Sequence, residues 1–281
     1  MYNIGLIFKP NLKEIDAIFQ ELLEIKRDFG VCFYVLEGID QSKSPLPFII
    51  KREEVKIDYI LCFGGDGTML RSVESSIEHD APVLGVNFGK LGFLSESSFK
   101  ELRNSIEDLV SKKYYLEARM LIDVCVNDDS GIIKKALNDV AIFKGNDSKL
   151  LKIRLYENTQ YVYETRSDGM VVSTPTGSTA YSLSAGGPIL SPSMSAMIVT
   201  PLNPHVLSVR PMVFSDNDVI ELRLSTNEKA NIQIDGISYG ELDCNDKVVI
   251  RKSKDVVKFV KLTQKSFYNI LRTKFNMGKR S

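Results

Sequence analysis

Hydrophobic and polar positions in the first 110 or so residues alternate between two periods. Short apolar runs, rich in β-branched and aromatic residues, occur at positions 2–8, 31–36, 59–63 and 82–87. Apolar residues with helical spacing occupy positions 12–29, 68–78 and 99–112. Because buried strands appear as short apolar runs and surface helices as 3.6-residue repeats, this alternation predicts a doubly wound, parallel α/β sheet.

The pattern changes to a period of two from about residue 117. Ile220, Leu222 and Leu224, for example, are separated by single charged residues, as in strands with one buried face. A helical pattern returns near the C-terminus. We therefore predict an α/β domain at 1–116, an all-β, sandwich-like domain at 117–262, and a C-terminal helix and tail at 263–281, the helix returning to the first domain.

The composition is that of an ordinary globular protein, with 281 residues of which 43% are hydrophobic and 26% charged. Because 36 basic residues balance 36 acidic ones, no net field draws the chain to nucleic acid or to an anionic membrane. No run approaches the roughly 18 apolar residues of a membrane helix, and no basic segment precedes the short apolar stretch at the start. We expect a cytoplasmic protein without a nucleic-acid or membrane partner.

Candidate metal chemistry is limited by the small number of soft ligands. Only two histidines are present, and the four cysteines are far apart, which disfavours a zinc site. Any required metal is expected to be a hard divalent cation, magnesium above all, held by carboxylates and substrate phosphates. The sequence assigns no individual metal ligand.

A glycine-rich loop, Gly64-Gly65-Asp66-Gly67-Thr68, follows one predicted strand and precedes a predicted helix. Phosphates bind at such positions, because glycines let backbone N–H groups approach and the helix offers its positive end. A carboxylate there would repel phosphate unless it binds a metal, orients a hydroxyl group or accepts that hydroxyl's proton, which are roles that phosphoryl transfer requires. The alternative is a tight turn with Asp66 as helix N-cap. The loop is neither a Walker A motif nor a dinucleotide fingerprint.

Two further segments carry polar groups next to predicted strands. Residues 85–94 hold three glycines and Lys90, so we expect a second loop at the same sheet edge, with Lys90 as a candidate phosphate contact. Asn138-Asp139 stands at the start of another strand. Its amide and carboxylate groups suit a ribose diol, and the pair suits a turn equally well.

A hydroxyl-rich segment spans residues 166–188. Seven of the twelve residues from Ser173 to Ser184 are Ser or Thr. Small hydroxyl residues line polar pockets for ribose, amide and phosphate groups, although a solvated loop has a similar composition. The apolar residues 170–172 before the run and two adjacent glycines after it favour the pocket.

Together these segments resemble the NAD kinase family, whose members transfer the terminal phosphoryl group of ATP or polyphosphate to the 2′-hydroxyl of NAD's adenosine ribose. GGDGT resembles one family motif, Asn138-Asp139 an Asn-Glu/Asp motif, residues 168–188 a glycine-rich third motif, and residues 200–205 a further segment. The resemblance implies an α/β domain followed by a β-sandwich-like domain. It also implies NAD and ATP as small-molecule substrates and a homodimer or homotetramer.

The resemblance further implies roles for the residues at matching positions. Asp66 is the expected proton acceptor and catalytic residue, and the expected phosphate loop consists of Gly64, Gly65, Gly67 and Thr68. Asp168 is expected near the nicotinamide end, and Tyr181 against a base. The full set of expected NAD contacts is Asp66, Gly67, Arg71, Asn138, Asp139, Lys149, Arg166, Asp168, Thr179, Ala180, Tyr181, Ser182, Leu183 and Ser184.

One departure from the family pattern and two rival functions stay open. Many members have a glutamine soon after an Asp-Gly pair late in the β domain, whereas here Asp235-Gly236 precedes Ile237, so the choice between NAD and NADH is undecided. Lipid kinases share the GGDGT motif, and a non-catalytic sensor would bind NAD without phosphorylating it. Zero net charge and the hydroxyl-rich segment favour a polar acceptor over a lipid.

Overall fold

The chain divides into two compact units. Unit 1 comprises Met1–Ala118 and Val257–Ser281, and unit 2 comprises Arg119–Val256. Two long strands, β7 (Tyr115–Val126) and β18 (Lys247–Lys261), run from one unit into the other. The computed structural model describes residues 1–39, 49–50, 55–89, 92–127, 134–145, 149–225, 228–244, 246–263 and 266–278.

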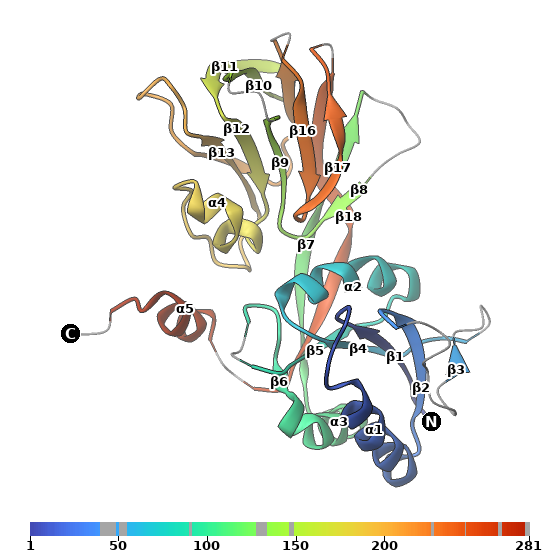
Figure 1. Cartoon of the computed structure of the whole chain (residues 1–281). Helices are drawn as coiled ribbons and strands as arrows, with labels where there is room; N and C mark the ends of the chain where they lie inside the picture. The colour runs from blue at the N-terminus through green and yellow to red at the C-terminus, as the bar shows by residue number, and fades with distance from the viewer. Residues whose placement is uncertain are drawn as a thin grey trace. The chain divides into compact units, whose positions relative to one another are not determined.

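Unit 1 is built from a parallel sheet and helices (Figure 1). Its own elements are β1 (Asn3–Phe8), α1 (Ile15–Phe29), β2 (Cys32–Glu37), β3 (Ile49–Ile50), β4 (Tyr59–Phe63), α2 (Asp66–His79), β5 (Val83–Asn87), β6 (Ser97–Ser98), the 3₁₀ helix η2 (Phe99–Glu101), α3 (Leu102–Val110) and α5 (Phe267–Phe275). The strands pair in the order β18-β5-β4-β1-β2-β3, with β6 beside β5, and the pairs are parallel. This is a doubly wound order, so the predicted doubly wound α/β fold of the first domain is confirmed.

Helices cover both faces of this sheet. Leu22 of α1 and Ile106 of α3 pack with Leu6 and Leu61 of the sheet in one buried cluster, and α2 lies over the opposite face (Figure 1). Because all these strands are parallel, their carboxyl ends meet at one edge. The GGDGT loop follows β4 at this edge.

Two helices of unit 1 differ in detail from the prediction. α2 begins at Asp66, two residues before the predicted start, because Gly65 takes the N-cap position. The helix predicted over 99–112 opens with the 3₁₀ turn η2, where Ser98 and Glu101 form a capping box. None of the helices in the described ranges is long and apolar enough to span a bilayer.

Unit 2 consists of two antiparallel sheets. Its own elements are β8 (Lys134–Ala136), β9 (Asp139–Lys144), β10 (Leu151–Glu157), β11 (Gln160–Ser167), β12 (Gly169–Ser173), η3 (Gly177–Thr179), α4 (Tyr181–Ser184), β13 (Ala196–Leu202), β14 (Met212–Ser215), β15 (Ile220–Leu224), β16 (Ala230–Ile234) and β17 (Ile237–Leu242). One sheet has the order β14-β13-β12-β9-β16-β17, and the other contains β11-β10-β15-β18, with β7 pairing with β18 and β8. The predicted sandwich-like fold is confirmed. The hydroxyl-rich segment, for which no helix was predicted, forms η3 and α4.

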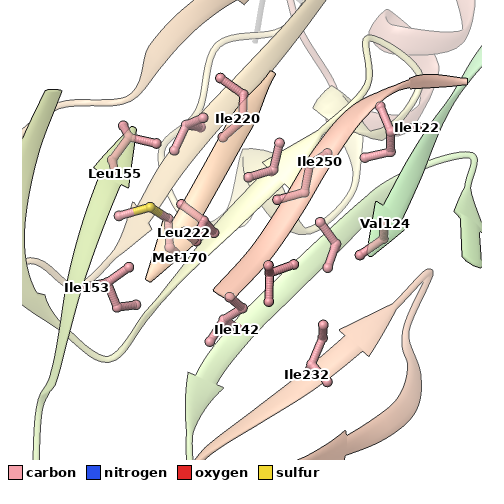
Figure 2. Packing of buried hydrophobic residues seen from close by; sticks show 14 of the residues in the cluster. Ile122, Val124, Ile142, Ile153, Leu155, Met170, Ile220, Leu222, Ile232 and Ile250 are labelled. Atoms are coloured by element: carbon pink, nitrogen blue, oxygen red, sulfur yellow. The ribbon is translucent and has the colours of Figure 1, made fainter. Parts of the chain in front are cut away.

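Side chains from the two sheets of unit 2 form one apolar core. Figure 2 shows Ile142 and Met170 of the six-stranded sheet in the same cluster as Ile153, Leu222 and Ile250 of the other sheet. All five are buried, and each such side chain contributes roughly 1.5–3 kcal/mol when it leaves water. Alternating apolar positions therefore hold this unit together.

The C-terminal helix α5 returns to unit 1, as predicted. The ring centroid of Phe93 lies 6.2 Å from that of Phe267 and 5.8 Å from that of Phe275. Two aromatic side chains of α5 thus pack on one side chain of the loop before β6. This contact places α5 beside the edge that carries the GGDGT loop.

Candidate active site

Backbone hydrogen bonds fix the GGDGT loop at the carboxyl end of β4. The Gly64 N–H donates to the Val86 carbonyl at 2.9 Å, and the Thr68 N–H donates to the Gly65 carbonyl at 2.9 Å. A Cβ atom at Gly64 would lie 2.2 Å from Thr68 Oγ1, whereas one at Gly65 or Gly67 would meet nothing within 4 Å. A ligand can therefore closely approach the first turn of α2, where helical N–H groups lack partners within the helix.

Asp66 connects this loop to the second glycine loop. Its Oδ2 accepts a hydrogen bond from the Phe93 N–H at 3.0 Å, and its Oδ1 accepts one from the Leu94 N–H at 3.1 Å. The expectation that the two loops meet at one sheet edge is confirmed, while Lys90 lies outside the described residues. Asp66 is not the N-cap of α2, since Gly65 holds that position. With its side chain 32% exposed, Asp66 retains acceptor capacity for a further donor.

Arg71 lies one turn further along α2. Its Nη2 donates to the Phe8 carbonyl at 2.9 Å, and its Nη1 is 3.5 Å from Glu37 Oε1. Both partners stand at the carboxyl ends of their strands, β1 and β2. These contacts give Arg71 a structural role at the site edge, and its contact with NAD stays a prediction.

The GGDGT loop offers one carboxylate, that of Asp66, to the expected magnesium ion. Among the residues that the structure describes, no three His, Cys, Asp or Glu side chains come together as a candidate metal cage. Asp66 offers one partly exposed carboxylate. Mg²⁺ commonly binds one or two carboxylates together with waters and substrate phosphates, so this donor set suits Mg²⁺ carried on phosphates.

In unit 2, Asp235 holds the Asn138-Asp139 pair in place. Its Oδ1 accepts hydrogen bonds from the N–H groups of Asn138 at 2.7 Å and Asp139 at 3.1 Å, and its Oδ2 accepts one from the Leu137 N–H at 2.8 Å. The Asp235 N–H donates to the Asp139 carbonyl at 2.9 Å. Asp235 and Gly236 have φ values of +48° and +77°, as in the two-residue turns that close β-hairpins. The hairpin between β16 and β17 thus presents a carboxylate to the start of β9.

The segment after β12 packs against the same pair. The Thr174 N–H donates to the Asn138 carbonyl at 2.9 Å, and Thr174 Oγ1 donates to the Leu137 carbonyl at 2.5 Å. A Cβ atom at Gly177 would lie 2.0 Å from the Asn138 carbonyl oxygen, so only glycine fits this approach. The fold therefore brings the second and third motifs together.

Asp139 has the most perturbed carboxyl group of this cluster. Burial and the neighbouring Asp235 carboxylate raise the pKa of Asp139 to about 7, and a hydrogen bond from the Tyr181 N–H opposes the shift. Burial also raises the pKa of Asp235, but its three backbone hydrogen bonds lower it. Because those bonds favour the ionised form of Asp235, we assign the proton that this pair holds to Asp139.

The predicted NAD contacts of the third motif lie on η3 and α4. Thr179 ends η3, Ala180 is the N-cap of α4, and α4 itself is Tyr181–Ser184. Ser182 is buried, with its Oγ 2.9 Å from Thr200 Oγ1. Tyr181 is 41% exposed, so its ring remains open to a ligand. Leu183 and Ser184 complete the helix, and their NAD contacts stay predictions.

Asp168, at the other end of β12, forms a polar cluster with Lys144 and Asn203. Its Oδ1 is 2.7 Å from Lys144 Nζ, and its Oδ2 accepts a hydrogen bond from Asn203 Nδ2 at 2.9 Å. The Lys144 ammonium and the Asn203 amide lower the pKa of Asp168. Burial and the charges of Asp139 and Asp168 raise the pKa of Tyr181, so the predicted contacts Asp139, Asp168 and Tyr181 lie within electrostatic reach of one another.

Lys149 and Arg166 are more exposed to solvent than Asp139 and Asp168. The Lys149 side chain is 76% exposed and donates to Glu228 Oε1 at 2.9 Å. Arg166 is also exposed, and its carbonyl accepts a hydrogen bond from the His205 N–H at 2.8 Å. Their roles in NAD binding stay predictions.

Two residues of these clusters were not identified from the sequence. Asp235 follows the alternating residues of β16 and precedes glycine, which is the pattern of a hairpin turn, but its bonds to Asn138 join positions about a hundred residues apart. Lys274 of α5 places its Nζ 3.8 Å from Asp66 Oδ2. No sequence motif marks Lys274, because only the return of α5 brings it to the loop.

Comparisons with known proteins agree across the whole chain. A family described as the ATP-NAD kinase N-terminal domain matches residues 4–114, and the ATP-NAD kinase C-terminal domain matches residues 137–262. An NAD kinase of Desulforamulus reducens is 38% identical, covering 98% of this chain and 97% of the relative. An NAD kinase of Heliobacterium modesticaldum is 36% identical, covering 99% of this chain and 100% of the relative.

Solved structures share the fold of this chain. The crystal structure of a yeast NADH kinase complexed with NADH has a TM-score of 0.89 and 26% identity, and covers 100% of this chain and 89% of that chain. An NAD kinase from Archaeoglobus fulgidus in complex with ATP has a TM-score of 0.72 and 24% identity, with 98% and 97% coverage, and thus supports the fold. Two domain matches and full-length relatives above 30% identity lead to one conclusion: the chain belongs to the NAD kinase family.

Proposed function

We propose that this protein is a phosphotransferase that moves the terminal phosphoryl group of ATP, or of polyphosphate, to the 2′-hydroxyl of NAD's adenosine ribose, producing NADP. The observation that carries the proposal is the placement of Asp66. Its carboxylate is fixed by two backbone N–H groups, beside glycines with open space around them. A positioned acceptor next to a phosphate-binding loop is the arrangement that in-line transfer to an alcohol needs.

Asp66 is the proton acceptor in this proposal. The 2′-hydroxyl oxygen forms a bond to the γ-phosphorus, the bond from that phosphorus to the bridging oxygen breaks, and ADP leaves. The hydroxyl proton passes to Asp66 as the new bond forms. Mg²⁺, when bound to the donor phosphates, neutralises their charge. Because general-base help is typically worth about 10²- to 10⁴-fold, positioning and charge neutralisation supply the larger share.

Unit 2 supplies the groups that bind NAD in this proposal. Asn138 and Asp139, held by Asp235, suit the two hydroxyls of a ribose because an amide and a carboxyl group offer both donors and acceptors. Tyr181 has an exposed ring for a base. Asp168, whose charge also acts on Tyr181, is assigned to the nicotinamide end. The polar segment Thr179–Ser184 completes this set.

The test is a coupled assay of NADP formation. Purified protein is incubated with NAD, ATP and MgCl₂, and NADP is detected through an NADP-specific dehydrogenase, with a metal-free reaction alongside. Asp66→Asn is expected to lower turnover by about 10²-fold or more, and NAD binding is measured separately so that a loss of chemistry is distinguished from a loss of substrate. The exposed Asp80, also on the protein's first unit, gives the matched control Asp80→Asn, which should retain activity.

The possible outcomes separate the candidate functions. Near-normal turnover of Asp66→Asn with unchanged NAD binding would remove Asp66 from the proposed mechanism. If no NADP appears, polyphosphate replaces ATP and NADH replaces NAD. Continued inactivity with tight NAD binding would support a sensor, and phosphorylation of a lipid acceptor would support a lipid kinase. Assembly as a homodimer or homotetramer, and a cytoplasmic location, stay predictions.

A further inference from the structure

We propose that Lys274, carried by the C-terminal helix α5, is a phosphate-binding residue of the site around Asp66 and contacts the phosphates of the donor. The inference rests on the proposed function, since it assigns a further residue to the donor side of the same reaction. Lys274 Nζ lies 3.8 Å from Asp66 Oδ2. It also lies 5.4 Å from the centroid of the Phe93 ring, within the range of a cation–π contact.

The position of Lys274 is set by the packing of α5. Phe267 and Phe275, one at each end of α5, both pack against Phe93. Phe93 is also the residue whose N–H donates to Asp66. One residue of the second loop therefore holds the carboxylate with its backbone and the helix with its side chain. Lys274, next to Phe275, is brought to the carboxylate by this shared support.

A buried ion pair fixes the chain just before α5. Glu96, close after Phe93, accepts hydrogen bonds from the N–H and Oγ1 of Thr263 at 3.0 and 2.7 Å, and its Oε2 is 3.2 Å from Lys261 Nζ. Both Glu96 and Lys261 are buried. Breaking such a pair leaves an uncompensated buried charge, so the chain is firmly held there. The segment 93–96 thus holds two parts of the chain in place. Glu96 holds residues 261 and 263, and Phe93 holds α5.

The charges around the loop give Lys274 a function. Asp66 introduces a negative charge beside glycines that suit a phosphate, and this charge opposes the approach of an anionic donor. Both Asp66 oxygens already accept a backbone hydrogen bond, so the carboxylate does not depend on Lys274 for a partner. The Lys274 side chain is 33% exposed, and an ammonium group has three donors. It can therefore bind a phosphate while it offsets the charge of Asp66.

The experiment compares Lys274→Met with Lys274→Arg. Methionine keeps an unbranched side chain without the charge, and arginine keeps the charge. Lys258, which pairs with Asp80 at 3.1 Å, supplies the matched control Lys258→Met. For each variant, KM for ATP, KM for NAD, kcat, the Kd of Mg²⁺·ATP without NAD, and Tm are measured.

We expect the effects of the substitution to be confined to ATP, the phosphoryl donor. Lys274→Met should raise the KM and Kd for ATP about tenfold, because a charge-assisted hydrogen bond is lost, while KM for NAD and Tm stay near wild type. Lys274→Arg should stay within about threefold of wild type. Lys258→Met should match the wild-type protein in every measurement.

Several results would overturn the assignment. Unchanged ATP binding in Lys274→Met would remove Lys274 from the donor site. A lower Tm with equal losses for ATP and NAD would show that the residue only helps α5 to pack, and Lys274→Arg as impaired as Lys274→Met would exclude a role of its charge. If the wild-type protein makes no NADP, the proposed function fails, yet the ATP titrations still decide the role of Lys274.

Discussion

Gly64, Gly65 and Gly67 share one loop but have different surroundings. A side chain at Gly64 would meet Thr68 in the folded protein itself. Side chains at Gly65 and Gly67 would project into open space, so the fold alone does not require glycine at these two positions. Glycine is also a poor residue for a helix, and Gly67 lies in the first turn of α2. A ligand that approaches the backbone explains why glycine stands there.

Gly67→Ala should therefore separate folding from function. We expect Tm to stay the same or rise slightly, because alanine favours the helix by roughly 0.5–1 kcal/mol. We expect the KM for ATP to rise about tenfold or more, equivalent to about 1.4 kcal/mol of binding free energy, because the added methyl group occupies the space of a phosphate. Thermal unfolding and steady-state kinetics measure the two effects. A variant with unchanged kinetics would contradict the role of this glycine.

The raised pKa of Asp139 makes the stability of the protein depend on pH. Asp139 is 5% exposed, and its pKa rises from 3.8 to about 7. Between these two values the unfolded chain releases the proton while the folded chain retains it, so stability falls as pH rises and then levels off above about 7. The shift corresponds to a loss of at most about 4 kcal/mol in the free energy of unfolding between these two pH values. Hydrogen bonds from Tyr181 and from a bound ribose would reduce the free-energy cost of ionising the buried Asp139 carboxyl group.

Asp139→Asn should remove this pH dependence. The Tm of the variant minus that of the wild-type protein is expected to be larger at pH 8 than at pH 5, because only at pH 8 does the wild-type protein bury a charge at this position. Asp168→Asn is the matched control. The pKa of Asp168 is lowered by Lys144 and Asn203, so its stabilisation is lost only at more acidic pH. A Tm difference for Asp139→Asn that is equal at pH 5 and pH 8 would contradict the raised pKa.

At the scale of elements, the β16–β17 hairpin acts as a support for β9. Its turn is short enough for Asp235 to reach the three consecutive N–H groups of residues 137–139. The neighbouring Ile237 is 61% exposed, at the position where the resemblance led us to expect glutamine. The hairpin therefore contributes through Asp235, whose bonds orient Asn138 and Asp139.

Asp235→Asn should weaken NAD binding through this support. Asparagine retains the left-handed turn, but its amide nitrogen would face a backbone N–H, so at least one hydrogen bond is lost. We expect a loss of about 2 kcal/mol of stability and a rise of about tenfold in KM for NAD, with KM for ATP unchanged. The exposed Asp243 provides the control Asp243→Asn. Equal increases in both KM values would argue against a specific effect on the ribose-binding pair.

The sequence pattern predicted most elements of the two units but not their local irregularities. The apolar run at 59–63 forms β4, with the same limits. A strand that is buried on both faces appears in the sequence as one continuous apolar run, so its ends can be predicted from the ends of the run. The start of α2 was misjudged because the glycines of the loop mask helical geometry at Asp66 and Gly67. The helix α4 was missed because serine and threonine are typical of loops as well. Short helices of this kind depend on tertiary contacts such as that between Ser182 and Thr200.

At the scale of the whole molecule, the proposed site residues fall into two groups within separate units. Motif resemblance proposed members of both groups, Asp66 in unit 1 and Asn138, Asp139 and Asp168 in unit 2. It could not identify Lys274, which depends on a helix about 200 residues away from the loop in sequence. Contacts between distant positions depend on topology, and a single sequence carries no direct record of them.

The two units should also be separable in part, because unit 2 is continuous in sequence and has its own apolar core. We expect a fragment of residues 119–256 to fold alone, with cooperative thermal unfolding and a dispersed NMR spectrum. Because Asp139, Asp235 and Tyr181 all belong to this unit, Asp139→Asn should produce the same pH-dependent change in Tm within the fragment. The fragment should form no NADP, since Asp66 and Lys274 are absent from it. A fragment without cooperative unfolding would show that the core of unit 2 requires unit 1.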